Sequence, residues 1–116
     1  MSRADPLRVA DYLAHILEAI RNIQEYTEGM SRSEFMIDRK TQDAVIRNLE
    51  VIGEACNNLS KNSPDFVAAH TSVPWGFAYE MRNALSHGYF KVDHAIVWQT
   101  LQDDLPTLQS QVAALV

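Results

Sequence analysis

The spacing of the large apolar residues constrains the fold of this chain more than any other feature. They recur in steps of three and four over most of the sequence, the period of a helix with one buried face. Nowhere do they alternate with a period of two for long, as a half-buried strand would require. One stripe consists of Val9, Leu13, Ile16, Ile20 and Ile23, and a second of Val45, Leu49, Ile52, Cys56 and Leu59. The spacing therefore predicts an all-α protein without a sheet.

Capping residues and prolines divide the chain into its expected helices. The first long helix starts at Asp5-Pro6 and is expected to end near Gly29. Ser31 is predicted to form a capping box with Glu34 and to start a short helix that holds Phe35 and Met36, and Asp38 starts the second long helix. Ser63-Pro64 starts a short segment through His70. The last two starts are Ser72-Val73-Pro74, for a helix that ends at His87 before Gly88, and Asp93. Pro106 is expected to kink or divide the last helix.

Four main helices with short connections predict an antiparallel helical bundle with short inserted helices. The last stripe runs through Ala95, Trp98, Leu101 and Leu105, and continues beyond Pro106 with Leu108, Val112 and Leu115. The helix before it is expected to bury Phe77, Ala78, Met81, Ala84 and Leu85. At 116 residues the chain fits one domain, spanning 1–116.

Composition limits the classes of function. A net charge of −5 argues against broad, non-specific binding of nucleic acid, which depends on clustered cations. It still allows a small site that touches one or two phosphates, and it leaves room for a basic partner. The single cysteine, Cys56, excludes an internal disulfide and fits a small core residue. No apolar run approaches the ~20 residues of a membrane span, and the N-terminal segment lacks the unbroken apolar core of a signal peptide, so a cytoplasmic protein is the default expectation.

The segment from Arg82 to Tyr89 differs from an ordinary solvated helix face. Such a face usually carries Lys and Glu, whereas this one carries hydrogen-bonding groups of other kinds, namely Tyr79, Arg82, Asn83, Ser86 and His87, followed by Gly88-Tyr89. From the residue types alone, an active site and a polar surface or dimer contact are about equally favoured.

Helical geometry indicates how Arg82 and His87 could act together. Five positions apart, they are offset by ~140° around the helix axis and ~7.5 Å along it. The Arg82 and His87 side chains of a single helix are therefore poorly placed to reach the same substrate atom. Two copies facing each other across a two-fold axis could supply Arg from one and His from the other to a shared cleft. The motif therefore predicts a homodimer.

Arginine and histidine together suit the cleavage of a phosphodiester. Arginine can hold two phosphate oxygens and offset the charge that builds in the transition state. Histidine can take a proton from an attacking hydroxyl or give one to a leaving oxygen. RNA supplies its own nucleophile, the 2′-hydroxyl, so this site needs no metal or other cofactor. DNA lacks that hydroxyl, and we find no carboxylate cluster for magnesium, so DNA is not an expected substrate.

The segment Arg82-Asn83-Ala84-Leu85-Ser86-His87 resembles the Arg-x4-6-His motif of the HEPN superfamily. Its extension His87-Gly88-Tyr89 is similar to the longer Arg-x4-His-x-Tyr form of the HepT-like branch. Further similarities to that branch are Arg47-Asn48-Leu49, Ile52-Gly53-Glu54-Ala55, Pro74-Trp75, Trp98, Asp104-Leu105-Pro106 and Leu108. The resemblance covers essentially the whole chain.

The resemblance implies a metal-independent endoribonuclease that acts as the toxin of a toxin–antitoxin pair. Carried over, Arg82 and His87 are catalytic, and Asn83 and Ser86 support them. An MntA-like nucleotidyltransferase antitoxin would silence the enzyme by transferring AMP to Tyr89. The Gly-Glu-Ala element adds a supporting role for Glu54, which would orient Arg82. From its residues alone, the stripe that holds Glu54 is a solvated helix face.

Two other functions remain open on the sequence. A non-catalytic HEPN module could present Tyr89 or bind nucleotides for a nucleotidyltransferase partner, and the acidic net charge mildly favours this alternative. A purely structural dimerisation bundle would need none of the outward-facing motif residues. Outside the motif, we interpret His15, His70 and His94 as ordinary surface histidines, and Trp75 and Trp98 as core or dimer anchors.

Overall fold

The computed structural model describes residues 6–87 and 92–116, and among these it omits the side chains of 6–7, 77, 82–84 and 86–87. The described ranges contain seven α-helices and no strand, which confirms the all-α prediction. The helices are α1 (Pro6–Tyr26), α2 (Arg32–Ile37), α3 (Arg39–Asn62), α4 (Pro64–Ala69), α5 (Trp75–His87), α6 (His94–Asp103) and α7 (Leu105–Ala113). None of these helices is long and apolar enough to cross a lipid bilayer.

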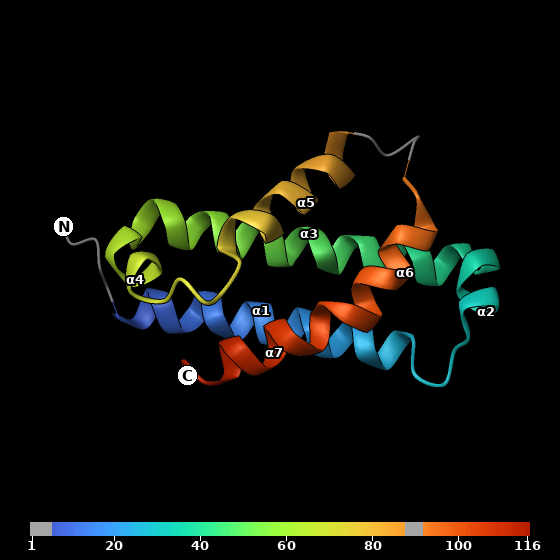
Figure 1. Cartoon of the computed structure of the whole chain (residues 1–116), viewed down its shortest axis with the longest axis horizontal. Helices are drawn as coiled ribbons and strands as arrows, with labels where there is room; N and C mark the ends of the chain where they lie inside the picture. The colour runs from blue at the N-terminus through green and yellow to red at the C-terminus, as the bar shows by residue number, and fades with distance from the viewer. Residues whose placement is uncertain (1–5, 88–91) are drawn as a thin grey trace.

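The helices form the predicted antiparallel bundle (Figure 1). The two longest, α1 and α3, lie side by side in opposite directions, and α5 packs on α3 as it returns along the molecule. The pair α6–α7 runs back along the bundle, so that α6 contacts α2 and α7 contacts α1. The short helices α2 and α4 close the two ends of α3.

The two apolar stripes predicted for α1 and α3 form the centre of the core. Except for the half-buried Val9, all of their residues are buried. Burial also raises the pKa of the Cys56 thiol to about 12. The thiol therefore stays protonated and unreactive at neutral pH, because only the thiolate is a good nucleophile. This confirms the interpretation of Cys56 as a core residue.

The expected start signals of α2 and α3 are confirmed. The Ser31 hydroxyl accepts a hydrogen bond from the Glu34 amide at 3.2 Å, and the Glu34 carboxylate accepts one from the Ser31 amide at 2.7 Å. Asp38 accepts hydrogen bonds from the Thr41 amide at 3.0 Å and the Thr41 hydroxyl at 2.8 Å. These bonds to the ionised form lower the pKa of Asp38.

Three boundaries differ from expectation or refine it. Helix α1 ends at Tyr26 instead of near Gly29, which has a φ of 73° and forms part of the turn that follows. Helix α5 starts at Trp75 instead of Ser72, because a residue that precedes proline, here Val73, is disfavoured in a helix. Pro106 sits in the first turn of α7 and divides the last helix after Asp103, as predicted.

The predicted stripe of the last helix is confirmed in part, since Leu101 and Leu105 are buried whereas Ala95 and Trp98 are half-buried. The buried residues of α6 are Val97, Thr100 and Leu101. Trp98 packs on the fully buried Phe35 of α2, with ring centroids 5.2 Å apart. Helix α6 thus packs both on the core and on the inserted helix α2, a contact that the period of α6 alone does not predict.

Candidate active-site helix and adjoining groove

Helix α5 carries most of the sequence motif. Arg82, Asn83, Ser86 and His87 all lie on its continuous backbone, which runs from Trp75 to His87. The angular and axial offsets expected between Arg82 and His87 therefore apply to their backbone positions. Tyr89 lies outside the described residues.

Helix α5 is anchored at its start and along one face. The Trp75 indole Nε1 donates a hydrogen bond to the His70 carbonyl at 3.0 Å, and its ring lies 6.3 Å from that of Phe66 in α4. Farther along, Ala78 and Leu85 are buried, which agrees with the predicted core face of the helix. Trp75 is thus confirmed as a core anchor, and it fixes the end of α5 opposite the motif.

A polar groove of about 550 Å³ lies between α1 and α3. Its residues come from one flank of each helix: Tyr12, His15, Arg47, Glu50, Val51, Glu54, Ala55 and Asn58. Tyr12 and His15 meet edge to face, with ring centroids 6.4 Å apart and planes at 78°. Val51 and Ala55 are the apolar members of the lining.

Glu54 is exposed and forms part of this groove, together with Glu50 and Arg47 of the same helix. Its neighbours across the groove are Tyr12 and His15 of α1. Glu50 and Glu54 each take part in further interactions. The predicted role of Glu54 in orienting Arg82 stays a prediction.

A second, small and apolar pocket lies between α3, α5 and the α6–α7 pair. It is lined by Leu49, Ile52, Pro74, Ala78, Met81, Thr100, Asp104, Leu105 and Leu108. Most of these residues are buried, so the pocket is a narrow gap in the core beside the helix that carries the motif.

The described residues contain no group of three or more His, Cys, Asp or Glu side chains placed to hold a metal ion. The expectation of a cofactor-free site is not tested by this observation and stays a prediction.

The family is identified by comparison with known proteins. A protein-family model described as "Ribonuclease HepT-like" matches residues 16–115 of this chain. The chain belongs to the HepT-like ribonuclease family. This confirms the resemblance drawn from the motif and its flanking segments. No solved structure matches the chain significantly.

Named relatives of this HepT-like chain cover nearly all of it. It is 45% identical to "Probable ribonuclease HepT" of Thermococcus cleftensis over 106 aligned residues. The aligned region covers 90% of this chain and 93% of the relative. It is 37% identical to a "Putative RNase" of Methanocaldococcus jannaschii, over 93% of this chain and 87% of the relative. A "Putative RNase" of Caldanaerobacter subterraneus is 38% identical, over 90% and 91% of the two chains.

The sequence of this HepT-like chain did not predict the polar groove. Tyr12 carried no signal of its own, and His15 was interpreted as an ordinary surface histidine. The signal that could have been used is their spacing of three residues, which places both on one flank of a helix. Pairing that flank with the polar stripe of α3 requires knowing which helices are neighbours.

Proposed function

We propose that this protein is a metal-independent endoribonuclease toxin whose active site combines Arg82 and His87 from two copies of the chain. Membership of the HepT-like family supports the ribonuclease activity. The observation that carries the proposal is the continuous helix α5, on which Arg82 and His87 lie five positions apart.

In the proposed reaction the RNA 2′-hydroxyl oxygen attacks the adjacent phosphorus, and the bond from phosphorus to the 5′-oxygen breaks. The products are a 2′,3′-cyclic phosphate and a free 5′-hydroxyl. His87 takes the proton from the nucleophile or gives one to the leaving oxygen. Arg82 holds two phosphate oxygens and offsets the added negative charge of the transition state. Asn83, Ser86 and Glu54 support this pair.

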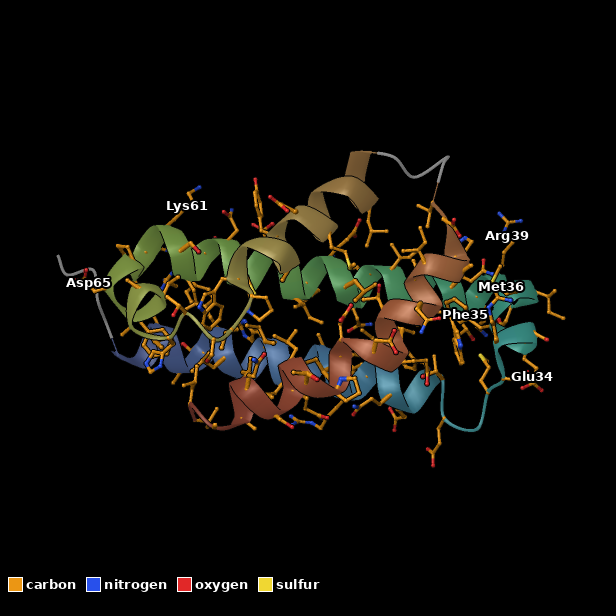
Figure 2. The ribbon with its side chains drawn as sticks, viewed as in Figure 1. Glu34, Phe35, Met36, Arg39, Lys61 and Asp65 are labelled. Carbon is orange, nitrogen blue, oxygen red and sulfur yellow. The ribbon has the colours of Figure 1, made fainter. Side chains whose placement is uncertain are left out.

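The first test compares expression of the wild-type chain with that of His87→Ala in a bacterial host. Wild type is expected to arrest growth and fragment RNA, whereas His87→Ala does neither, because the loss of a general acid or base costs roughly 10²–10⁴-fold in rate. Growth and total RNA are measured after induction. Arg39→Ala is a control, since Arg39 is exposed and belongs to the start of α3, outside the motif helix (Figure 2).

The contradicting result is intact RNA with wild type as well as with His87→Ala, after mass spectrometry shows Tyr89 to be unmodified. The chain would then be better explained as a non-catalytic module that binds a nucleotidyltransferase. Its acidic net charge of −5 is compatible with that alternative.

We further propose that an MntA-like nucleotidyltransferase silences the enzyme by moving AMP from ATP to the Tyr89 hydroxyl, with release of pyrophosphate. The adenylyl group would add negative charge and bulk two residues after His87, where it competes with RNA for Arg82. Tyr89→Phe lacks the acceptor hydroxyl and is expected to remain toxic when such an enzyme is co-expressed, whereas wild type is silenced and gains the mass of one AMP. Silencing of Tyr89→Phe to the same extent as wild type would contradict this proposal.

A further inference from the structure

Exposed apolar side chains gather at the end of the bundle where α2 meets the start of α6. Five large apolar side chains are exposed within the described residues, and three of them lie on these two helices. They are Met36 at 38% exposure, Ile37 at 85% and Ile96 at 61%. Single exposed apolar side chains are ordinary, whereas a group of them rimmed by polar residues marks a binding surface. This end of the molecule is therefore a candidate contact surface.

The three side chains flank one contact between the two helices. The ring of Phe35 in α2 lies 6.4 Å from that of His94 in α6. Met36 and Ile37 directly follow Phe35 in the chain, and Ile96 comes two residues after His94. The two helices meet at one end of the bundle (Figure 1). Because Phe35 is fully buried in this contact, the backbone that carries the exposed side chains is held in place.

Cations adjoin these apolar side chains. Arg32, Arg39 and Lys40 are exposed, and they are three of the ten lysines and arginines in a chain whose net charge is −5. Figure 2 shows Arg39 and Met36 at the same end of the molecule. Arg39 and Lys40 are the first two residues of α3, where the helix dipole disfavours positive charge. The stability of α3 therefore does not explain why cations occupy these positions.

The two carboxylates of the same segment serve as helix caps. The Glu34 carboxylate accepts a hydrogen bond from the Ser31 amide at 2.7 Å, and the Asp38 carboxylate accepts one from the Thr41 amide at 3.0 Å. Both carboxylates are thus held against the start of a helix. A partner that brings carboxylates of its own to this surface would meet three exposed cations beside exposed apolar side chains.

A different protein fits this surface better than a second copy of the chain or RNA does. Two copies joined here about a two-fold axis would bring six cations together, and like charges across an interface are costly. Aliphatic side chains such as Ile37 and Ile96 offer no ring on which a base can stack. A protein surface that combines apolar side chains with carboxylates complements both features.

We propose that the nucleotidyltransferase of the proposed function docks on this surface through an apolar, acidic surface of its own. The docking surface consists of Arg32, Met36, Ile37, Arg39, Lys40 and Ile96. Its position in the chain supports this partner. Val92 packs on the core and follows Tyr89 by three residues, and three residues span at most ~11 Å. An enzyme bound at the start of α6 is thus held near the acceptor tyrosine. The inference rests on the proposed function, since it takes the silencing enzyme as the partner.

The test measures docking without AMP transfer. Full-length His87→Ala protein is immobilised, and binding of the nucleotidyltransferase used in the Tyr89→Phe experiment is followed by biolayer interferometry without ATP. Ile37→Asp in this background is expected to raise the dissociation rate about tenfold or more, because a charge replaces an apolar contact at the centre of the interface. Arg39→Glu is expected to lower the association rate and to reduce its dependence on salt, because a steering charge is lost.

Matched controls lie at the other end of the molecule. Lys61 is exposed in the last turn of α3 (Figure 2), so Lys61→Glu makes the same change of charge on the same helix. Val116 is 81% exposed, so Val116→Asp matches Ile37→Asp. Both controls are expected to bind like their parent. Ile37 and Arg39 lie outside the motif helix, so Ile37→Asp and Arg39→Glu are expected to leave RNA cleavage unchanged when made in the wild-type background.

Unchanged binding in both Ile37→Asp and Arg39→Glu overturns the inference, as does the absence of any binding by their parent. Loss of RNA cleavage in Arg39→Glu overturns it too, since the cations would then serve RNA. The two proposals can fail separately. If the docking variants are adenylylated and silenced as fast as wild type, the docking surface is wrong and the proposed function stands. If wild type cleaves no RNA while the docking variants lose partner binding, the docking surface stands and the ribonuclease proposal fails.

Discussion

Mixing Arg82→Ala protein with His87→Ala protein is expected to restore ribonuclease activity that neither variant has alone. If each site takes Arg82 from one copy and His87 from the other, a mixed dimer contains one intact site and one site that lacks both groups. Half of the dimers in an equal, fully exchanged mixture are mixed. The recovered rate is therefore about a quarter of the wild-type rate, against a background lower by about two orders of magnitude or more.

The measurement is cleavage of a fluorogenic RNA after the two variants are co-expressed or refolded together, so that their subunits exchange. A mixture of His87→Ala with Arg82→Ala/His87→Ala is the matched control, because no pairing of those chains gives an intact site. If wild type is active but the first mixture stays as inactive as this control, Arg82 and His87 act within one copy, and the shared site is wrong.

Phe35→Ala is expected to lower the free energy of unfolding by about 3–5 kcal/mol, the usual cost of truncating a fully buried phenylalanine. Phe35 has no exposed surface, and its ring lies 5.2 Å from that of Trp98 and 6.4 Å from that of His94. Figure 2 shows Phe35 where α2 meets the start of α6. The loss is measured by urea unfolding followed by circular dichroism.

A substitution at Ile37, two residues after Phe35, is the control for this stability prediction. Ile37 ends the same helix and is 85% exposed, so Ile37→Ala is expected to change the stability by less than about 0.5 kcal/mol. Similar losses in the two variants would show that α2 contributes through its own helicity and not through the burial of Phe35 between α2 and α6.

The cores of α1 and α3 could be predicted from the sequence because each buries one stripe at a fixed helical period. Ile16 and Ile52 are buried where that period places them. The capping box of Ser31 and Glu34 was predictable for a similar reason, since both of its hydrogen bonds join residues three apart. Where local spacing decides the structure, the sequence alone was sufficient.

Contacts between distant segments could not be predicted in the same way. Tyr12 and Glu54 line one groove although a whole inserted helix separates them in the chain. Helix α6 buries Val97 and also packs on α2, a contact that its own period does not predict. The motif itself was found through its residue types and its family resemblance, whereas the proposed partnership of Arg82 with a second copy depends on surfaces that one chain does not contain.

The buried thiol at position 56 has a practical consequence. The sequence contains no other cysteine, and burial keeps this one protonated far above neutral pH. A cysteine introduced at an exposed site would therefore be the sole thiol that maleimide or methanethiosulfonate reagents modify in the folded protein. Spin labels can thus be attached without first replacing the native residue. Distances between labels on two copies would then report on how the copies associate in solution.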